Sequence, residues 1–150
     1  MKAKLNYMTA APDGFQAMMA ISDYVQESGL EHSLLELVKI RASQINGCAF
    51  CLDMHIRDAR AAGETEARIY LLPAWRETAV YSPREQAALA WTEALTQLST
   101  DAAERVYDEV RAQFDDHEMA KLAIAIGVIN IWNRLNVAFG VQPVIKKAAA

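Results

Sequence analysis

The two cysteines of this 150-residue chain, Cys48 and Cys51, are three positions apart, and His55 follows four positions after Cys51. On an α-helix, residues three and four positions apart share a face, so a helix here would place all three side chains in one stripe. The free N–H groups and the dipole of a helix N-terminus stabilise anions, and so they lower the pKa of a thiol. An imidazole beside it can take the thiol proton. These residues therefore predict a redox-active dithiol with an attached base.

Local signals favour that helix. The pair Asn46-Gly47 indicates a turn, the residues CAFCLDMHIRDARAA after it are rich in helix formers, and Gly63 is suited to end a helix. The pattern therefore predicts a helix from Cys48 to Ala62, with both cysteines in or near its first turn.

Two other interpretations of the cysteines stay open. They can be core thiols at helical spacing, or they can bind zinc together with His55. A structural zinc site takes four ligands, and the fourth would have to be a histidine distant in sequence, His32 or His117. A disulfide across so short a loop would constrain little of the unfolded chain, so the pair is not expected to stabilise the fold as a structural disulfide.

The stretch ELVKIRASQINGCAFCLDMHIRDARAAGE resembles the core motif of the alkylhydroperoxidase D-like (AhpD-like) proteins, in the carboxymuconolactone decarboxylase superfamily. The family pattern, a glutamate followed by C-x-x-C-x-x-x-H, maps onto Glu36, Cys48, Cys51 and His55. The similarity continues through ETEARIYLLPAWRETAVYSPREQAALAWTEALT and, more weakly, INIWNRLNVAF, and so covers most of the chain. It implies an all-α AhpD-like helical bundle with the CxxC at the N-terminus of a central helix. It also implies a homo-oligomer, commonly a trimer or hexamer.

The resemblance further implies a cysteine peroxidase that reduces hydroperoxides through a dithiol/disulfide cycle. In the family the second cysteine attacks the peroxide, which makes Cys51 the implied nucleophile and Cys48 its disulfide partner. His55 is the implied base, and Glu36 the implied outermost group of a proton relay to Cys48, directly or through water. A dithiol reductant, such as a lipoyl-bearing or thioredoxin-like protein, would restore the thiols, and some members serve a peroxiredoxin. This chemistry requires no metal or organic cofactor.

Several alternatives compete with this interpretation. Glu36 also has the capping-box spacing with Ser33, and one carboxylate cannot fully serve both roles. The same cysteines would suit a thiol-disulfide oxidoreductase that serves a partner protein, or a non-catalytic oligomeric redox sensor. The superfamily's lactone decarboxylase chemistry does not call for a CxxC pair, so Cys48 and Cys51 argue against it.

Composition narrows the class of protein. The net charge is −4, and the sequence has no basic block, so a nucleic-acid partner is not expected. No apolar run reaches the roughly 18 residues that span a bilayer, and the N-terminal MKAKLNYMTAAPDG lacks the apolar core of a signal peptide. We therefore expect a cytoplasmic protein without a membrane partner.

No segment alternates with the period of a strand, so the CxxC does not lie in the βαβ setting of a thioredoxin fold. Asn133-Arg134, near the end of an apolar helix, is expected to join a buried polar network, while Phe50 and Tyr81 fit core packing better than a substrate approach.

We expect one domain, 1–150. Its predicted elements are an arm (1–11), helices at Pro12–Glu27, Ser33–Ile45, Cys48–Ala62 and Glu64–Leu72, a loop at Trp75–Thr78, helices at Ser82–Leu98, Thr100–Phe114 and Asp115–Phe139, and a tail (141–150).

Overall fold

A computed structural model describes residues 3–145, and all of the regular structure in that range is helical. This confirms the all-α prediction, and the predicted helices agree with the observed ones to within one or two residues at each end. The predicted loop at Trp75–Thr78 differs, since a 3₁₀ helix continues through Glu77. In chain order the elements are α1 (Tyr7–Ala10), α2 (Pro12–Gln26), α3 (His32–Asn46), α4 (Ala49–Ala61), α5 (Glu66–Leu71), the 3₁₀ helix η1 (Leu72–Glu77), α6 (Pro83–Gln97), α7 (Thr100–Gln113) and α8 (Asp116–Phe139).

Side-chain caps explain several helix boundaries. At the start of α6, the Ser82 hydroxyl accepts a hydrogen bond from the Glu85 N–H at 3.2 Å, and the Glu85 carboxylate accepts one from the Ser82 N–H at 2.7 Å. Asp115 and Glu118 form the same reciprocal pair at the start of α8. Each such box satisfies two N–H groups that the helix leaves free. The long helix α8 therefore begins where the sequence predicts.

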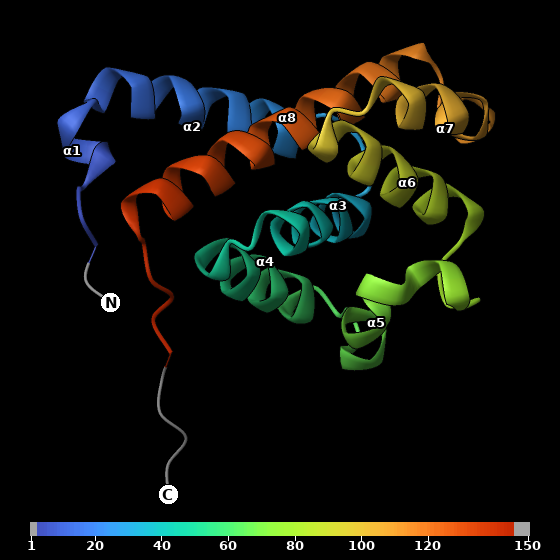
Figure 1. The fold of residues 1–150 in the computed structure, drawn as a ribbon, viewed down its shortest axis with the longest axis horizontal. Helices are drawn as coiled ribbons and strands as arrows, with labels where there is room; N and C mark the ends of the chain where they lie inside the picture. Colours follow the sequence, from blue (N-terminus) through green and yellow to red (C-terminus); the bar gives the residue numbers. More distant parts are fainter. Residues whose placement is uncertain (1–2, 146–150) are drawn as a thin grey trace, which may run out of the picture.

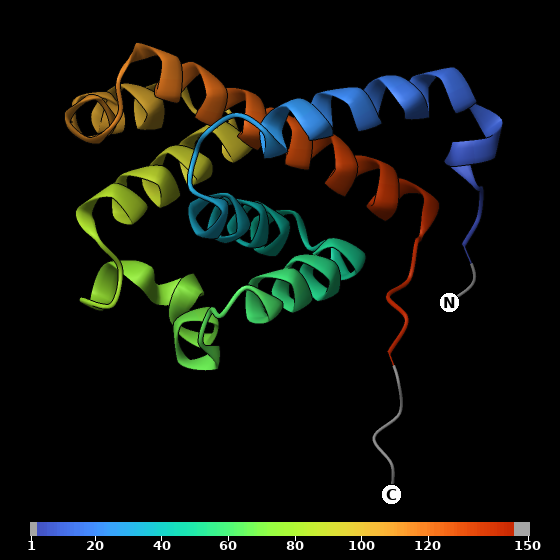
Figure 2. The same cartoon turned by 180° about the vertical axis from the view of Figure 1, so that it is seen from behind.

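Helix α3 lies at the centre of the bundle, with α4, α6 and α8 packed around it (Figures 1 and 2). Leu35, Leu37, Val38 and Ile40 of α3 are fully or almost fully buried, so this helix is covered on more than one side. Because α4 packs against α3 and α8, its first turn points into the bundle rather than to solvent.

By length and composition, α8 is also apolar enough to cross a membrane, and in residues 3–145 it is the one helix of which this is true. This corrects the sequence-based expectation that no apolar segment is long enough. Core helices pass the same test, and 44% of the apolar segment is buried inside this bundle. Three buried asparagines, Asn130, Asn133 and Asn136, also lie on α8 and bond to neighbouring parts of the chain.

The two ends of the described chain meet α8 and α4. Tyr7–Ala10, expected to be part of an arm, is a short helix whose Tyr7 is buried, and the Lys4 N–H donates to the Phe139 carbonyl at 2.8 Å. After α8 the residues 141–145 are not helical, and the Arg57 guanidinium donates to the Val144 carbonyl at 2.8 Å. The predicted arm and tail extend to 1–2 and 146–150, which lie outside the described residues.

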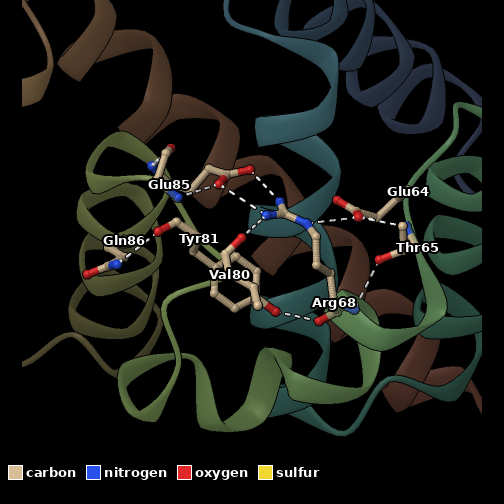
Figure 3. Close-up of polar contacts among 8 residues, drawn as sticks. Glu64, Thr65, Arg68, Val80, Tyr81, Glu85 and Gln86 are labelled. Atoms are coloured by element: carbon tan, nitrogen blue, oxygen red, sulfur yellow. Dashed lines mark hydrogen bonds and ion pairs between the residues drawn. The ribbon is translucent and has the colours of Figure 1, made fainter.

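Arg68 ties α5 to the start of α6 (Figure 3). Its guanidinium donates to Glu64 at 2.9 Å and to Glu85 at 2.5 Å, and the Tyr81 hydroxyl donates to the Arg68 carbonyl. Tyr81 is buried in the core cluster that also holds Leu37. Tyr81 therefore serves core packing, as the sequence predicts, and this network fixes the side of the bundle that holds α5 and η1.

A buried dithiol at the start of a helix

Cys48 is the N-cap residue of α4, and Cys51 lies in the first turn of that helix. The Cys48 sulfur accepts a hydrogen bond from the Cys51 backbone N–H at 3.4 Å. Gly47 has a φ of 66° and ends α3, so the chain turns sharply just before Cys48. Glycine adopts this left-handed conformation without the strain other residues meet. Both cysteines are free thiols with 1% of their surface exposed, and they lie together as the spacing predicts.

The two thiols differ in acidity because one donates to the other. A hydrogen bond from Cys48 is the largest cause that lowers the pKa of Cys51, to about 6, and donors from Asn136 and Asn133 and the charge of His55 outweigh the opposing effect of burial. The same hydrogen bond, followed by burial, raises the pKa of Cys48. A thiolate is the reactive form of cysteine. The arrangement therefore favours a Cys51 thiolate beside a protonated Cys48.

Asn136 and Tyr7 complete the surroundings of Cys51, and the sequence analysis did not find them. The Asn136 side-chain Nδ2 donates to the Cys51 sulfur at 3.3 Å, and the Tyr7 hydroxyl donates to Asn136 Oδ1 at 3.0 Å. Both residues are buried. Their one signal in the sequence is that Asn136 follows Asn133 by one helical turn in an otherwise apolar segment.

Asn133 belongs to the buried polar network predicted for this part of the chain. It is fully buried, donates to the Ser43 hydroxyl at 2.9 Å and accepts from the Asn46 amide at 2.9 Å. The Asn133 amide also acts to lower the pKa of both Cys48 and Cys51, with a smaller effect than the hydrogen bond between the two thiols. The network therefore joins the end of α3 and α8 around the dithiol.

Glu36 and His55 form a second buried pair. His55 Nδ1 lies 2.9 Å from Glu36 Oε2, and the Lys39 ammonium donates to Glu36 Oε1 at 2.9 Å. Burial raises the pKa of Glu36, but the hydrogen bond and charge of His55 and the charge of Lys39 outweigh it, so the pKa lies below its usual value. A carboxylate at Nδ1 fixes the orientation of an imidazole.

The predicted capping box of Ser33 and Glu36 is wrong. The N-cap of α3 is Glu31, and no side chain caps that end. Helix α3 begins one residue earlier than expected, and the Glu36 side chain turns inward, where 3% of its surface is exposed. Glu36 bonds to His55 and not, within residues 3–145, to Cys48. A proton path from Glu36 to the thiols would therefore run through His55.

A cavity of about 400 Å³ lies between α2, α4 and α8 and contains Cys51 and His55 in its wall. Within residues 3–145 no hydrogen bond joins His55 directly to a thiol, so the cavity is where a proton would pass between them. Phe50 packs against the core cluster of Ala42, Cys48, Cys51 and Ile129, as expected, and it also lines this cavity. Other apolar side chains of the wall include Phe15, Met19, Met54, Val128, Ile129 and Trp132.

The donor set for a zinc ion is not gathered around the thiols. In the part of the chain that the structure describes, the one group of three potential ligands with atoms within 4.8 Å of one another is Glu36, His55 and Asp58. Cys48 and Cys51 are not in that group, and Lys39 already occupies one oxygen of Glu36. The zinc interpretation of Cys48, Cys51 and His55 therefore has no support in the geometry.

Comparison with known proteins places this arrangement in a family. Residues 12–94 match the carboxymuconolactone decarboxylase family. YdfG, an uncharacterised protein of Bacillus subtilis, is 44% identical over 141 residues, which are 93% of this chain and 96% of that protein.

Solved structures agree with the fold. A crystal structure from Agrobacterium tumefaciens, of a protein of unknown function suggested to be the antioxidant defence protein AhpD, has a TM-score of 0.92 and 46% identity. The match covers 97% of this chain and 100% of that one. A debrominase has a TM-score of 0.80 at 19% identity, with coverage of 91% and 74%, which shows a shared fold alone. Proteins with this fold therefore differ in what they act on.

Proposed function

We propose that this chain, which belongs to the carboxymuconolactone decarboxylase family and has an AhpD-like fold, is a peroxidase that reduces hydroperoxides with the Cys48–Cys51 pair. One observation carries the proposal. The Cys51 thiol lies in the wall of a cavity, and the Cys48 sulfur is close enough to accept a hydrogen bond from the Cys51 backbone N–H at 3.4 Å. A nucleophile and a resolving thiol in contact are what a dithiol peroxidase needs.

The first step is attack on the peroxide. The Cys51 thiolate attacks the terminal oxygen of the hydroperoxide, the O–O bond breaks, and Cys51 becomes a sulfenic acid while an alkoxide leaves. Cys48 gives its proton to the alkoxide, which leaves as the alcohol. The hydrogen bond from Cys48 to Cys51 supports this role because the proton already lies beside the reacting sulfur.

The second step closes the disulfide. The Cys48 thiolate attacks the Cys51 sulfur, the S–O bond breaks, and hydroxide leaves as water with a proton from His55. That proton is the one His55 took when Cys51 ionised, and the Glu36 carboxylate at 2.9 Å stabilises the imidazolium meanwhile. An external dithiol then reduces the disulfide by exchange. The sum is one hydroperoxide and one dithiol converted to alcohol, water and donor disulfide.

The wall of the cavity supports organic hydroperoxides as substrates. Phe15, Phe50 and Trp132 offer aromatic surface, and Met19 and Met54 offer adaptable apolar surface. The donor proposed is a lipoyl-bearing or thioredoxin-like protein, with a peroxiredoxin as a further partner. A homo-trimer or homo-hexamer is proposed for the assembly, because α2 and α8 leave large apolar side chains exposed, among them Ile21, Tyr24 and Ile131.

Turnover of tert-butyl hydroperoxide with dithiothreitol tests the proposal. Wild type should consume the peroxide, Cys51→Ser should lose turnover, and Cys48→Ser should form a sulfenic acid at Cys51 that dimedone traps. Full activity in Cys51→Ser would exclude the assignment. Faster reduction of a disulfide substrate than of the peroxide would favour the thiol-disulfide oxidoreductase instead. A disulfide that forms once, without turnover, would favour the redox sensor.

A further inference from the structure

The reactive sulfur has a hydrogen-bond donor from the opposite end of the sequence. Asn136 Nδ2 lies 3.3 Å from the Cys51 sulfur, although the two residues are 85 positions apart. Asn136 is 3% exposed, so its amide is largely removed from bulk water. A hydrogen bond to a charged acceptor is worth more away from bulk water than in it. The amide therefore favours the thiolate over the thiol.

A second hydrogen bond decides how that amide is turned. An asparagine side chain has a donor and an acceptor of similar shape, and a thiolate accepts only, so the wrong orientation would place Oδ1 against the negative sulfur. The Tyr7 hydroxyl donates to Asn136 Oδ1 at 3.0 Å. Burial, followed by the charges of Cys51 and Cys48, raises the pKa of Tyr7, so the hydroxyl keeps the proton it donates. Tyr7 therefore holds Nδ2 toward the sulfur.

Packing keeps Tyr7 in place. Its ring centroid lies 6.4 Å from that of Phe15, 6.4 Å from that of Trp132 and 6.0 Å from that of Phe139. The Lys4–Phe139 backbone hydrogen bond holds the preceding residues against the end of α8. In both views of the fold, α1 lies near that end of α8 (Figures 1 and 2). The N-terminal segment is thus part of the wall of the site.

We propose that Asn136 is a catalytic residue that stabilises the Cys51 thiolate, and that Tyr7 on α1 is the positioning residue that orients it. Both lie outside residues 12–94, the part of the chain that matches the family, so the family match does not assign them. The inference rests on the proposed role of Cys51 as the reactive thiol. It makes the N-terminal helix a determinant of thiol acidity, beyond its place in the packing.

The test is the pH dependence of Cys51 alkylation by iodoacetamide in the reduced protein, followed by mass spectrometry of the Cys51 peptide. Asn136→Leu loses one hydrogen bond to a charged group, so the pH midpoint of its Cys51 alkylation should rise by about one pH unit. Tyr7→Phe keeps the aromatic packing and should raise the midpoint by about half as much. Tyr24→Phe is the matched control, since Tyr24 is an exposed tyrosine of α2 outside the cavity wall, and its midpoint should equal that of wild type.

An unchanged midpoint in Asn136→Leu would overturn the inference. If Asn136→Leu shifts the midpoint and Tyr7→Phe does not, the role of Tyr7 is refuted. Tyr7→Phe also keeps the proposal testable should Asn136→Leu fail to fold. Alkylation uses no peroxide, so the shifts would stand even if peroxide turnover proved absent, and a lack of shifts would leave the peroxidase assay unaffected.

Discussion

Replacing Glu36 by glutamine removes one charge from the buried His55–Glu36–Lys39 cluster and changes the shape of the side chain very little. A glutamine oxygen can still accept from His55 Nδ1, which in the wild type lies 2.9 Å from Glu36 Oε2. A hydrogen bond to a charged group contributes about 1.5–3 kcal/mol and a neutral one about 0.5–1.5 kcal/mol, so the imidazolium loses about 1.5 kcal/mol of stabilisation. Since 1.36 kcal/mol is a factor of ten, kcat/KM for tert-butyl hydroperoxide should fall about tenfold at about pH 5, where the Cys51 thiolate is the minor form.

The same substitution should lower stability, and this effect has to be separated from the rate. The Lys39 side chain is 14% exposed and loses its anionic partner, while its bond to Gln26 Oε1 at 3.3 Å remains. We expect a loss of about 2 kcal/mol in the free energy of unfolding, measured by urea denaturation. The peroxidase assay is therefore run well below the unfolding transition, where both proteins are fully folded.

Glu93→Gln provides the matched control. Glu93 is a half-buried carboxylate, 15% exposed, and accepts from the Trp75 indole at 2.9 Å and the Arg41 guanidinium at 2.9 Å, but it lies outside the cavity wall. Glu93→Gln should lose stability and keep its peroxidase rate. The reasoning fails if Glu36→Gln keeps the wild-type rate, or if it slows turnover no more than Glu93→Gln does.

Three further predictions concern the Cys51 thiol and two residues with a positive φ, Gly47 and Leu98. Because the pKa of Cys51 is lowered to about 6, its thiolate is lost as the pH falls through that value, and its alkylation rate should drop about tenfold between about pH 7 and about pH 5; a midpoint near that of a free thiol would contradict the site geometry. Gly47 has a φ of 66°, so Gly47→Ala should cost about 1 kcal/mol in urea denaturation, and an unchanged midpoint would contradict it. Leu98 has a φ of 52° and is 79% exposed, so Leu98→Gly should raise the free energy of unfolding by up to about 1 kcal/mol; a decrease would refute the assignment of strain there.

The sequence predicts the helices well because their limits are set locally. The boxes of Ser82 with Glu85 and of Asp115 with Glu118, and the turn at Asn46-Gly47, all act within a few residues of the helix end they fix. Ser33-x-x-Glu36 has the same local form, yet the box is not made. The buried pair with His55 and Lys39 takes the carboxylate instead, and that competition depends on how α4 packs on α3.

The same distinction explains which parts of the site could be predicted. Cys48, Cys51 and His55 share one helix, so their spacing alone determines that they share a face. Tyr7 and Asn136 approach each other across 129 positions, and nothing near either residue in the sequence indicates a partner. The Tyr7 hydroxyl holds the Asn136 amide, and the aromatic contacts of α1 with α2 and α8 hold Tyr7 in place. The acidity of the thiol is therefore set jointly by a local motif, which supplies the helix end and the second thiol, and by the docking of the N-terminal helix, which turns one amide toward the sulfur.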